Sequence, residues 1–125
     1  MNSRIRTYRD LLVWQKAMDV ALAVLRLATR LNRPNLFALA DQLRRAAVSV
    51  PSNLAEGHGR RSRGEYIRYV AIANGSLREL ETQLLLLGRL ESGLGAETDI
   101  LLVQTDEIGR MLNGLHKRLT TPSRP

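Results

Sequence analysis

Apolar residues spaced in alternating steps of four and three constrain the fold of this chain more than any other feature of its sequence. The clearest run lies in the segment 63–90 and consists of Tyr66, Val70, Ala73, Leu77, Leu80, Leu84 and Leu87. Such spacing places every member of the run on one face of an α-helix. Ser62 and Glu65 are spaced as a capping box, which predicts that this helix begins directly after Ser62.

Three more segments show the same periodicity and predict helices over residues of about 8–31, 34–58 and 96–120. Only a few residues separate each helix from the next, so consecutive helices must run antiparallel. With 125 residues, the chain is long enough to bury one core without disulfides or metals. We therefore predict an all-α fold, an antiparallel up-down-up-down four-helix bundle that forms a single domain, with loose tails at 1–6 and 121–125.

Two local features compete with this regular pattern. Pro51 lies inside the second helix, where its ring removes a backbone hydrogen bond and clashes with the carbonyl group of Ala47. We predict a kink at Pro51, with Ser49 or Ser52 helping to satisfy the freed backbone groups; the alternative is a break between two short helices. An Asn-Gly pair that ends at Gly75 is by itself typical of a hairpin turn. Because it lies within the most regular run, Gly75 is interpreted as a point of close helix packing.

The first helix carries two apolar stripes instead of one. The first, assigned to the core, consists of Leu11, Trp14, Met18, Ala21, Leu25 and Ala28. The second consists of Val13, Ala17, Val20, Val24, Leu27 and Leu31. Together they span roughly 160° of the helix surface, against about 100° for a helix with one buried face. Either the helix is buried more deeply between its neighbours, or the second stripe forms a subunit interface. We favour the interface and predict a homo-oligomer.

Composition and motifs exclude several classes of function. The chain has no cysteine, which rules out disulfides, thiolate metal sites and a cysteine nucleophile. His58 and His116 lack the Glu-x-x-His spacing of metal sites in helical bundles, so we expect no metal and no cofactor. The local sequence pairs no serine with both a histidine and an acid, and we expect no catalytic residues and no enzymatic activity. The chain shows no signal-peptide pattern and no membrane-spanning stretch, which predicts a cytoplasmic protein without membrane contact.

Positive charge is concentrated at one end of the predicted bundle. The net charge is +7, from 19 Lys and Arg residues against 12 Asp and Glu residues. In an antiparallel bundle the start of the first helix, the end of the second, the start of the third and the end of the fourth meet at one pole. This basic pole gathers Arg4, Arg6, Arg9, Arg60, Arg61, Arg63, Lys117, Arg118 and Arg124, against Asp10, Glu56 and Glu65.

At the opposite end, the neutral pole, the charges cancel. It holds Arg30, Arg33 and Arg89 against Glu91, Glu97 and Asp99. Arg68 lies near the basic pole on the third helix, whereas Arg44 and Arg45 lie in the middle of the second, where Arg44 could instead pair with Glu81. These three arginines and the basic pole are candidates for nucleic-acid binding, because such a surface suits a phosphate backbone. The alternative is that the basic pole is only a solvated end of the bundle.

One long motif resembles a known family. The run from Asp41 to Ser62, DQLRRAAVSVPSNLAEGHGRRS, is similar to the signature of the 23S rRNA intervening-sequence protein family, and the segments 10–17 and 75–84 resemble its first and third helices. The resemblance implies a four-helix bundle assembled as a homopentamer. It also implies similarity to the accessory proteins of diversity-generating retroelements, in which a basic pentamer binds nucleic acid and a reverse transcriptase. The family has no agreed biochemical role.

These observations lead to two hypotheses of function. The first is a non-enzymatic, oligomeric accessory protein that binds the backbone of RNA or DNA through the basic pole. The few aromatic residues argue against recognition of single strands by base stacking. The alternative is an oligomeric scaffold whose basic face docks an acidic protein partner.

Overall fold

The computed structural model describes residues 5–122, and within that range it is helical throughout, without β-strands. The long helices are α1 (Leu12–Thr29), α2 (Phe37–His58), α3 (Arg63–Leu90) and α4 (Gly95–Thr120). Short 3-10 helices precede three of them: η1 (Tyr8–Asp10), η2 (Pro34–Leu36) and η3 (Ser92–Leu94). The predicted all-α fold is confirmed. Of the predicted loose tails, residues 1–4 and 123–125 lie outside the described residues.

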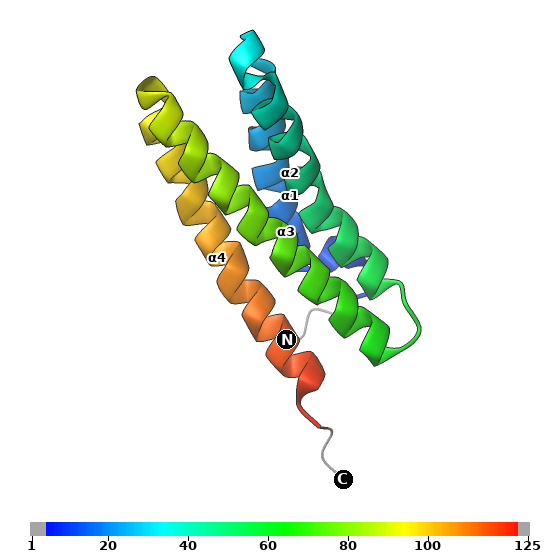
Figure 1. The fold of residues 1–125 in the computed structure, drawn as a ribbon. Coiled ribbons are helices and arrows are strands. Elements are labelled where there is room, and N and C mark those ends of the chain that lie inside the picture. Colours follow the sequence, from blue (N-terminus) through cyan, green and yellow to red (C-terminus); the bar gives the residue numbers. More distant parts are fainter. Residues whose placement is uncertain (1–4, 123–125) are drawn as a thin grey trace.

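The four long helices run alternately up and down, and each packs against its neighbours in the chain (Figure 1). Contacts between α1 and α4 close the bundle. The core is built mainly from leucine on the inner faces of all four helices. Its largest fully buried members are Leu27, Leu43, Leu54, Leu77, Leu80, Leu84, Leu87, Ile108 and Leu112. Burial of these aliphatic side chains is the main stabilising contribution to the bundle.

The start of the chain differs from the predicted helix over 8–31. Thr7 and Asp10 form a capping box, because the Thr7 hydroxyl accepts from the backbone N–H of Arg9 while the Asp10 carboxylate accepts from the backbone N–H of Thr7. It caps only η1, however. Leu11 then adopts an extended conformation (φ −73°, ψ 121°), and α1 begins at Leu12. Hydrogen bonds to the backbone N–H groups of Thr7 and Arg6 hold the pKa of Asp10 below its ordinary value.

Pro51 does not divide the second helix. α2 is a single helix from Phe37 to His58, so the alternative of two short helices separated by a break is wrong. Ser49 uses its hydroxyl to contact Ser76 of α3, with 2.7 Å between the two oxygens. Asn53 donates from Nδ2 to the backbone carbonyl of Ser49 at 2.8 Å. The Asn53 side chain thus binds the backbone oxygen of Ser49, two residues before Pro51, and the Ser49 hydroxyl connects α2 to α3.

The second stripe of helix 1 was predicted to form a subunit interface, and this is wrong. Its members are 0–6% exposed within a single chain: Val13, Ala17, Val20, Val24, Leu27 and Leu31. They face the core, together with Ala21 and Ala28 of the first stripe. Met18 of the first stripe is instead 44% exposed, and Leu22 is 48% exposed. The core-facing side of α1 is therefore rotated from the side that the sequence pattern favoured.

Two glycines allow neighbouring helices to approach closely, and neither is Gly75. A Cβ atom on Gly57 would lie 2.5 Å from the Cβ of Tyr69, across the α2–α3 contact. One on Gly88 would lie 2.6 Å from the hydroxyl oxygen of Thr98, across the α3–α4 contact. Around Gly75 there is nothing within 4 Å, so its interpretation as a close-packing point is wrong.

Candidate nucleic-acid interface

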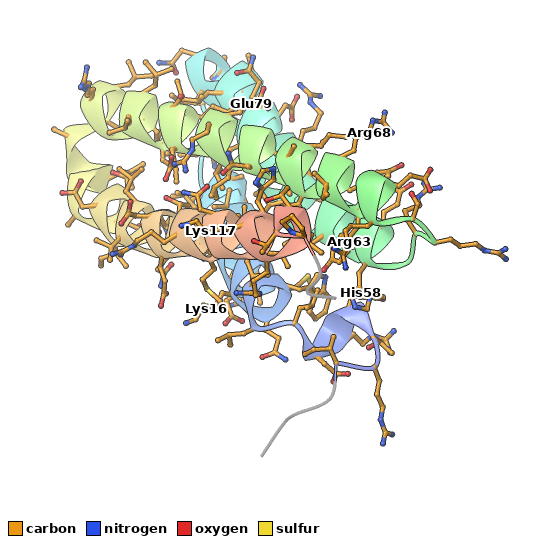
Figure 2. All side chains as sticks on the ribbon, turned by 90° about the horizontal axis from the view of Figure 1, so that it is seen from below. Lys16, His58, Arg63, Arg68, Glu79 and Lys117 are labelled. Atoms are coloured by element: carbon orange, nitrogen blue, oxygen red, sulfur yellow. The ribbon has the colours of Figure 1, made fainter. Side chains whose placement is uncertain are left out.

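The ends of the helices that were expected to share one pole do share it. Figure 1 shows the start of α1, the end of α2, the start of α3 and the end of α4 at the lower end of the bundle. His58, Arg63 and Lys117, on three different helices, lie at this end in Figure 2. The antiparallel topology alone therefore brings residues far apart in the sequence onto one surface.

Besides Arg6 and Arg9 near the chain start, four basic side chains of this pole are exposed and unpaired within residues 5–122: Arg61, Arg63, Lys117 and Arg118. None of the four has a carboxylate within salt-bridge distance among residues 5–122. Local structure explains their positions. Arg61 lies in the short α2–α3 connection, and Arg63 opens α3 directly after Ser62, whose hydroxyl accepts from the backbone N–H of Glu65 at 3.1 Å. Their charge is thus available to a ligand from solvent.

Arg60 is held in a network that reasoning from sequence did not find. Its guanidinium donates to a carboxylate oxygen of Glu56 at 2.7 Å and to the hydroxyl of Tyr69 at 2.7 Å. The same Tyr69 hydroxyl donates to Glu56 at 3.1 Å. The hydrogen bond with Glu56 raises the pKa of Arg60 above its ordinary value. The spacing of Glu56 and Arg60, four residues apart at the end of α2 and just beyond it, was the available signal.

Arg68 lies beside this network. Its guanidinium carbon lies 5.6 Å from the centre of the Tyr69 ring, and that of Arg60 lies 4.9 Å from the same centre. Both distances are within the range of cation–π attraction. Near the chain start, Arg9 contacts the Tyr8 ring at 5.5 Å, and Arg6 is exposed. Arg4 and Arg124 lie outside the described residues.

Aromatic side chains fix the helices at the basic pole. Tyr8 and Trp14 meet edge to face with ring centres 5.2 Å apart, and His58 and Tyr66 do the same at 5.7 Å. Partial burial raises the pKa of Tyr66, so the phenol stays neutral at physiological pH. These four rings pack against one another at the basic pole.

Arg44 and Arg45 are not brought to the basic pole. Arg44 pairs with Asp41 at 2.9 Å on its own helix and also donates to the backbone carbonyl of Ala28 at 3.4 Å. Its suggested partner Glu81 instead pairs with Arg78 at 2.7 Å, so the predicted Arg44–Glu81 bridge is wrong. Arg45 is exposed in the middle of α2.

At the neutral pole, two of the three arginines are paired. Arg30, which ends α1, binds Glu97 of α4 through both guanidinium nitrogens, at 2.8 and 2.7 Å. The hydrogen bond from Arg30 lowers the pKa of the Glu97 carboxyl. Arg33 pairs with Glu91, across the helix connections. Arg89 is exposed, without an ion pair among the described residues.

Residues 5–122 contain no cluster of three or more His, Cys, Asp or Glu side chains that could hold a metal ion. In the same range, no helix is long and apolar enough to cross a membrane. An apolar groove of about 540 Å³ lies between the start of α1 and the end of α4, with Leu12, Met111 and Leu115 in its walls and Arg110 and Arg118 beside them.

Residues 9–114 match the family model described as 23S rRNA-intervening sequence protein, which covers most of the chain. The chain belongs to this family. It is also similar to the crystal structure of a protein with unknown function from the S23 ribosomal protein family of Bacteroides thetaiotaomicron. That comparison gives 26% sequence identity and a TM-score of 0.80, and it covers 85% of this chain and 99% of the other. No curated protein matches.

In this member of the 23S rRNA-intervening sequence protein family, the matched region does not contain the whole basic pole. It includes the Glu56–Arg60–Tyr69 network, Arg61 and Arg63. It ends before Lys117 and Arg118. The α2–α3 side of the pole therefore lies within the part that defines the family, and the α4 side extends beyond it.

Proposed function

We propose that this protein is a non-enzymatic accessory factor that binds the phosphate backbone of RNA or DNA through its basic pole. One observation carries the proposal: Arg61, Arg63, Lys117 and Arg118 are exposed on three adjoining segments of one pole and have no acidic partner among the described residues. Arginine suits this role because its guanidinium donates to phosphate through two nitrogens. The family description, which refers to an intervening sequence of rRNA, also supports RNA as a ligand.

Recognition of the backbone, with little reading of sequence, is the mode that this surface supports. Phosphates lie at regular intervals along any nucleic acid, and a small group of unpaired cations can neutralise several of them while counterions are released. The basic pole consists of helix ends and a short connection, so it forms no helix that could enter a major groove along its length. We expect RNA and DNA to bind with similar affinity.

Self-association is part of the proposal but involves different residues from those that the sequence suggested. The second stripe of α1 is buried inside one chain, whereas other large apolar side chains are exposed on three helices. They include Met18, Leu22, Leu86, Leu90, Ile100 and Val103. Exposed apolar surface of this kind is typical of protein contacts. A pentamer is supported by the family resemblance alone, and light scattering across a concentration series tests it.

The groove between α1 and α4 favours a second candidate function. Its apolar walls and the neighbouring Arg118, which is unpaired among the described residues, suit an amphipathic, acidic segment of a partner protein. In that case the protein is a scaffold whose basic side docks a protein, and binding to nucleic acid is weak or absent.

Fluorescence anisotropy with the pure protein and labelled RNA and DNA duplexes tests the first function. At about 50 mM salt, where phosphate contacts are strong, we expect binding to both. The double variant Arg61→Ala with Arg63→Ala should bind at least about tenfold more weakly to each, because each lost phosphate contact weakens binding regardless of sequence.

The matched control is the double variant Arg26→Ala with Arg89→Ala. These arginines are also exposed and unpaired among the described residues, but they lie in the last turns of α1 and α3 at the neutral pole. Each double variant removes the same charge, so equal losses would show general charge attraction without a defined binding surface. A wild-type protein that binds neither duplex would favour the scaffold function.

A further inference from the structure

A small polar pocket lies between α3 and α4, on the half of the bundle that carries the basic pole. Its volume is about 230 Å³, and it is lined by Val70, Ala71, Asn74, Leu112, Asn113 and His116. It is smaller than the roughly 300–1,000 Å³ of a pocket for a drug-sized ligand. It is also much larger than the volume of about 30 Å³ that one water molecule occupies. A flat ring of the size of a nucleobase suits this volume.

The polar groups of the pocket are free to bind a ligand. The side-chain oxygen of Asn74 is buried and has no hydrogen-bond partner among the described residues. Asn113 and His116 are exposed, and their side chains make no hydrogen bond within residues 5–122. A buried acceptor without a partner is uncommon and unfavourable in a folded protein. Rotation of the Asn74 side chain would bring this oxygen toward the pocket. A ligand that donates a hydrogen bond to it would then relieve the cost.

The pocket adjoins the cations that carry the proposed function. Asn113 and His116 are three residues apart on α4, and Lys117 is four residues from Asn113, so all three lie on the same side of that helix. Figure 2 shows Lys117 and Arg63 at the end of the bundle where α4 ends and α3 begins. A strand whose phosphates contact these cations can therefore place one base over the α3–α4 pocket.

We propose that this pocket accepts one unpaired adenine of the bound nucleic acid. This inference rests on the proposed function and adds a base preference to it. The carboxamide of asparagine pairs with adenine through one donor and one acceptor, whereas guanine is typically read by Arg or Lys and cytosine by Asp or Glu. The pocket is lined by two asparagines and none of those charged residues. Ala71 supplies the exposed apolar part of the pocket wall, in place of aromatic stacking.

The base must be unpaired because a pocket between two helices cannot admit a base pair. Extruding a base from a duplex is unfavourable, and the cost is smallest for a base that is already unpaired. A bulged adenine is therefore the appropriate probe. We expect the wild-type protein to bind an RNA duplex with a single bulged adenine at least about fivefold more tightly than the fully paired duplex, and more tightly than one with a bulged cytosine.

The double variant Asn113→Ala with His116→Ala tests whether the preference arises in this pocket. Both side chains are exposed, so the substitutions should leave the fold intact, which circular dichroism can verify. We expect the variant to bind the bulged and the paired duplexes equally, with an affinity for the paired duplex close to that of wild type. Gln104→Ala, an exposed polar residue on another side of α4, is the matched control and should retain the preference.

The variant of the basic pole separates this inference from the proposed function. Arg61→Ala with Arg63→Ala should weaken binding to all duplexes by the same factor and leave the ratio between them unchanged. Equal binding of all duplexes by wild type would overturn the pocket assignment but not the backbone function, and so would a preference that survives in the Asn113→Ala, His116→Ala variant. A bulged cytosine bound as tightly as adenine would overturn the adenine assignment. Binding to no duplex would overturn both proposals.

Discussion

The two ends of the bundle use their arginines differently. At the neutral pole, Arg30 and Arg33 pair with Glu97 and Glu91 and tie together segments that are distant in sequence. At the basic pole, the helices are held by edge-to-face aromatic contacts and by the close approach of α2 and α3 at Gly57. Arg61 and Arg63 there take no part in ion pairs among the described residues.

This difference indicates how one bundle can be stable and still keep a binding surface. Where ion pairs join the helices, the charge is already neutralised by protein and is not available to a ligand. Where apolar and aromatic packing joins them, Arg61 and Arg63 remain free of ion pairs among the described residues, although Arg60 is held by Glu56. Substitutions that disturb helix packing at the basic pole should therefore lower stability, whereas substitutions of its unpaired arginines should weaken ligand binding and leave stability unchanged.

The largest expected effect tests the packing of the basic pole. Gly57→Ala would place a Cβ atom 2.5 Å from the Cβ of Tyr69, which is close to the backbone and has little freedom to move. Overpacking of this kind is expected to lower the free energy of unfolding by about 1–3 kcal/mol. Urea denaturation of the wild type and the variant measures this loss.

Gly75→Ala is the matched control, because it also adds a methyl group to a helix and meets nothing within 4 Å. It should raise the free energy of unfolding by about 0.5–1 kcal/mol, through the better helix propensity of alanine. If both variants lost stability equally, the close contact at Gly57 would not be what holds α2 to α3.

A smaller effect is expected where one acidic residue restrains the basic pole. Glu56→Gln should strengthen binding to an RNA duplex by about two- to threefold, because it removes a negative charge and weakens the hold of Glu56 on Arg60. Glu65→Gln removes the same charge nearby without releasing an arginine and should have less effect. Anisotropy titrations in one buffer make the comparison. Weaker binding by Glu56→Gln would show that the network positions Arg60 for the ligand.

The smallest effect concerns the pH dependence of the neutral pole. The pKa of Glu97 is lowered from its ordinary value of 4.5 by Arg30. The carboxylate therefore stabilises the folded state above that value, and this contribution is lost as the pH falls through the folded-state pKa. At pH 7 the wild type should have a slightly higher Tm than Glu97→Gln, and the difference should vanish in acid.

Asp99→Asn serves as the control for this experiment, because Asp99 also lies in the first turns of α4 and has no ion pair among residues 5–122. It should show no such pH-dependent difference from wild type. A Tm difference for Glu97→Gln that stays constant from pH 7 to acid would contradict a role for the charged pair.

The features that were predicted correctly from sequence are set by local patterns or by topology. α3 begins and ends where the pattern predicted, because its seven apolar residues and the Ser62 cap are all contained in the segment itself. The meeting of four helix ends at one pole follows from the antiparallel order alone. The location of the basic pole could therefore be predicted without a single tertiary contact.

The features that were missed depend on neighbouring helices. Both stripes of α1 have the same spacing, and only the placement of α2 and α4 decides that Val24 is buried and Met18 is exposed. Gly75 and Gly57 both lie in helical segments, and only the proximity of Tyr69 distinguishes them. Arg44 likewise pairs with Asp41 and not with Glu81 because of where these side chains lie in the folded chain. Sequence spacing shows which residues share one face of a helix, but only the assembled bundle shows whether that face is buried or exposed.

The salt dependence of RNA binding tests the central claim most directly. For wild type, log affinity should fall linearly with log salt concentration, with a slope of about −0.9 for each phosphate contacted in a duplex. The Arg61→Ala, Arg63→Ala variant should show a slope shallower by about one to two units. The Arg26→Ala, Arg89→Ala variant should keep the wild-type slope. Equal flattening by both variants, or by neither, would contradict the claim that the unpaired arginines of the basic pole form the binding surface.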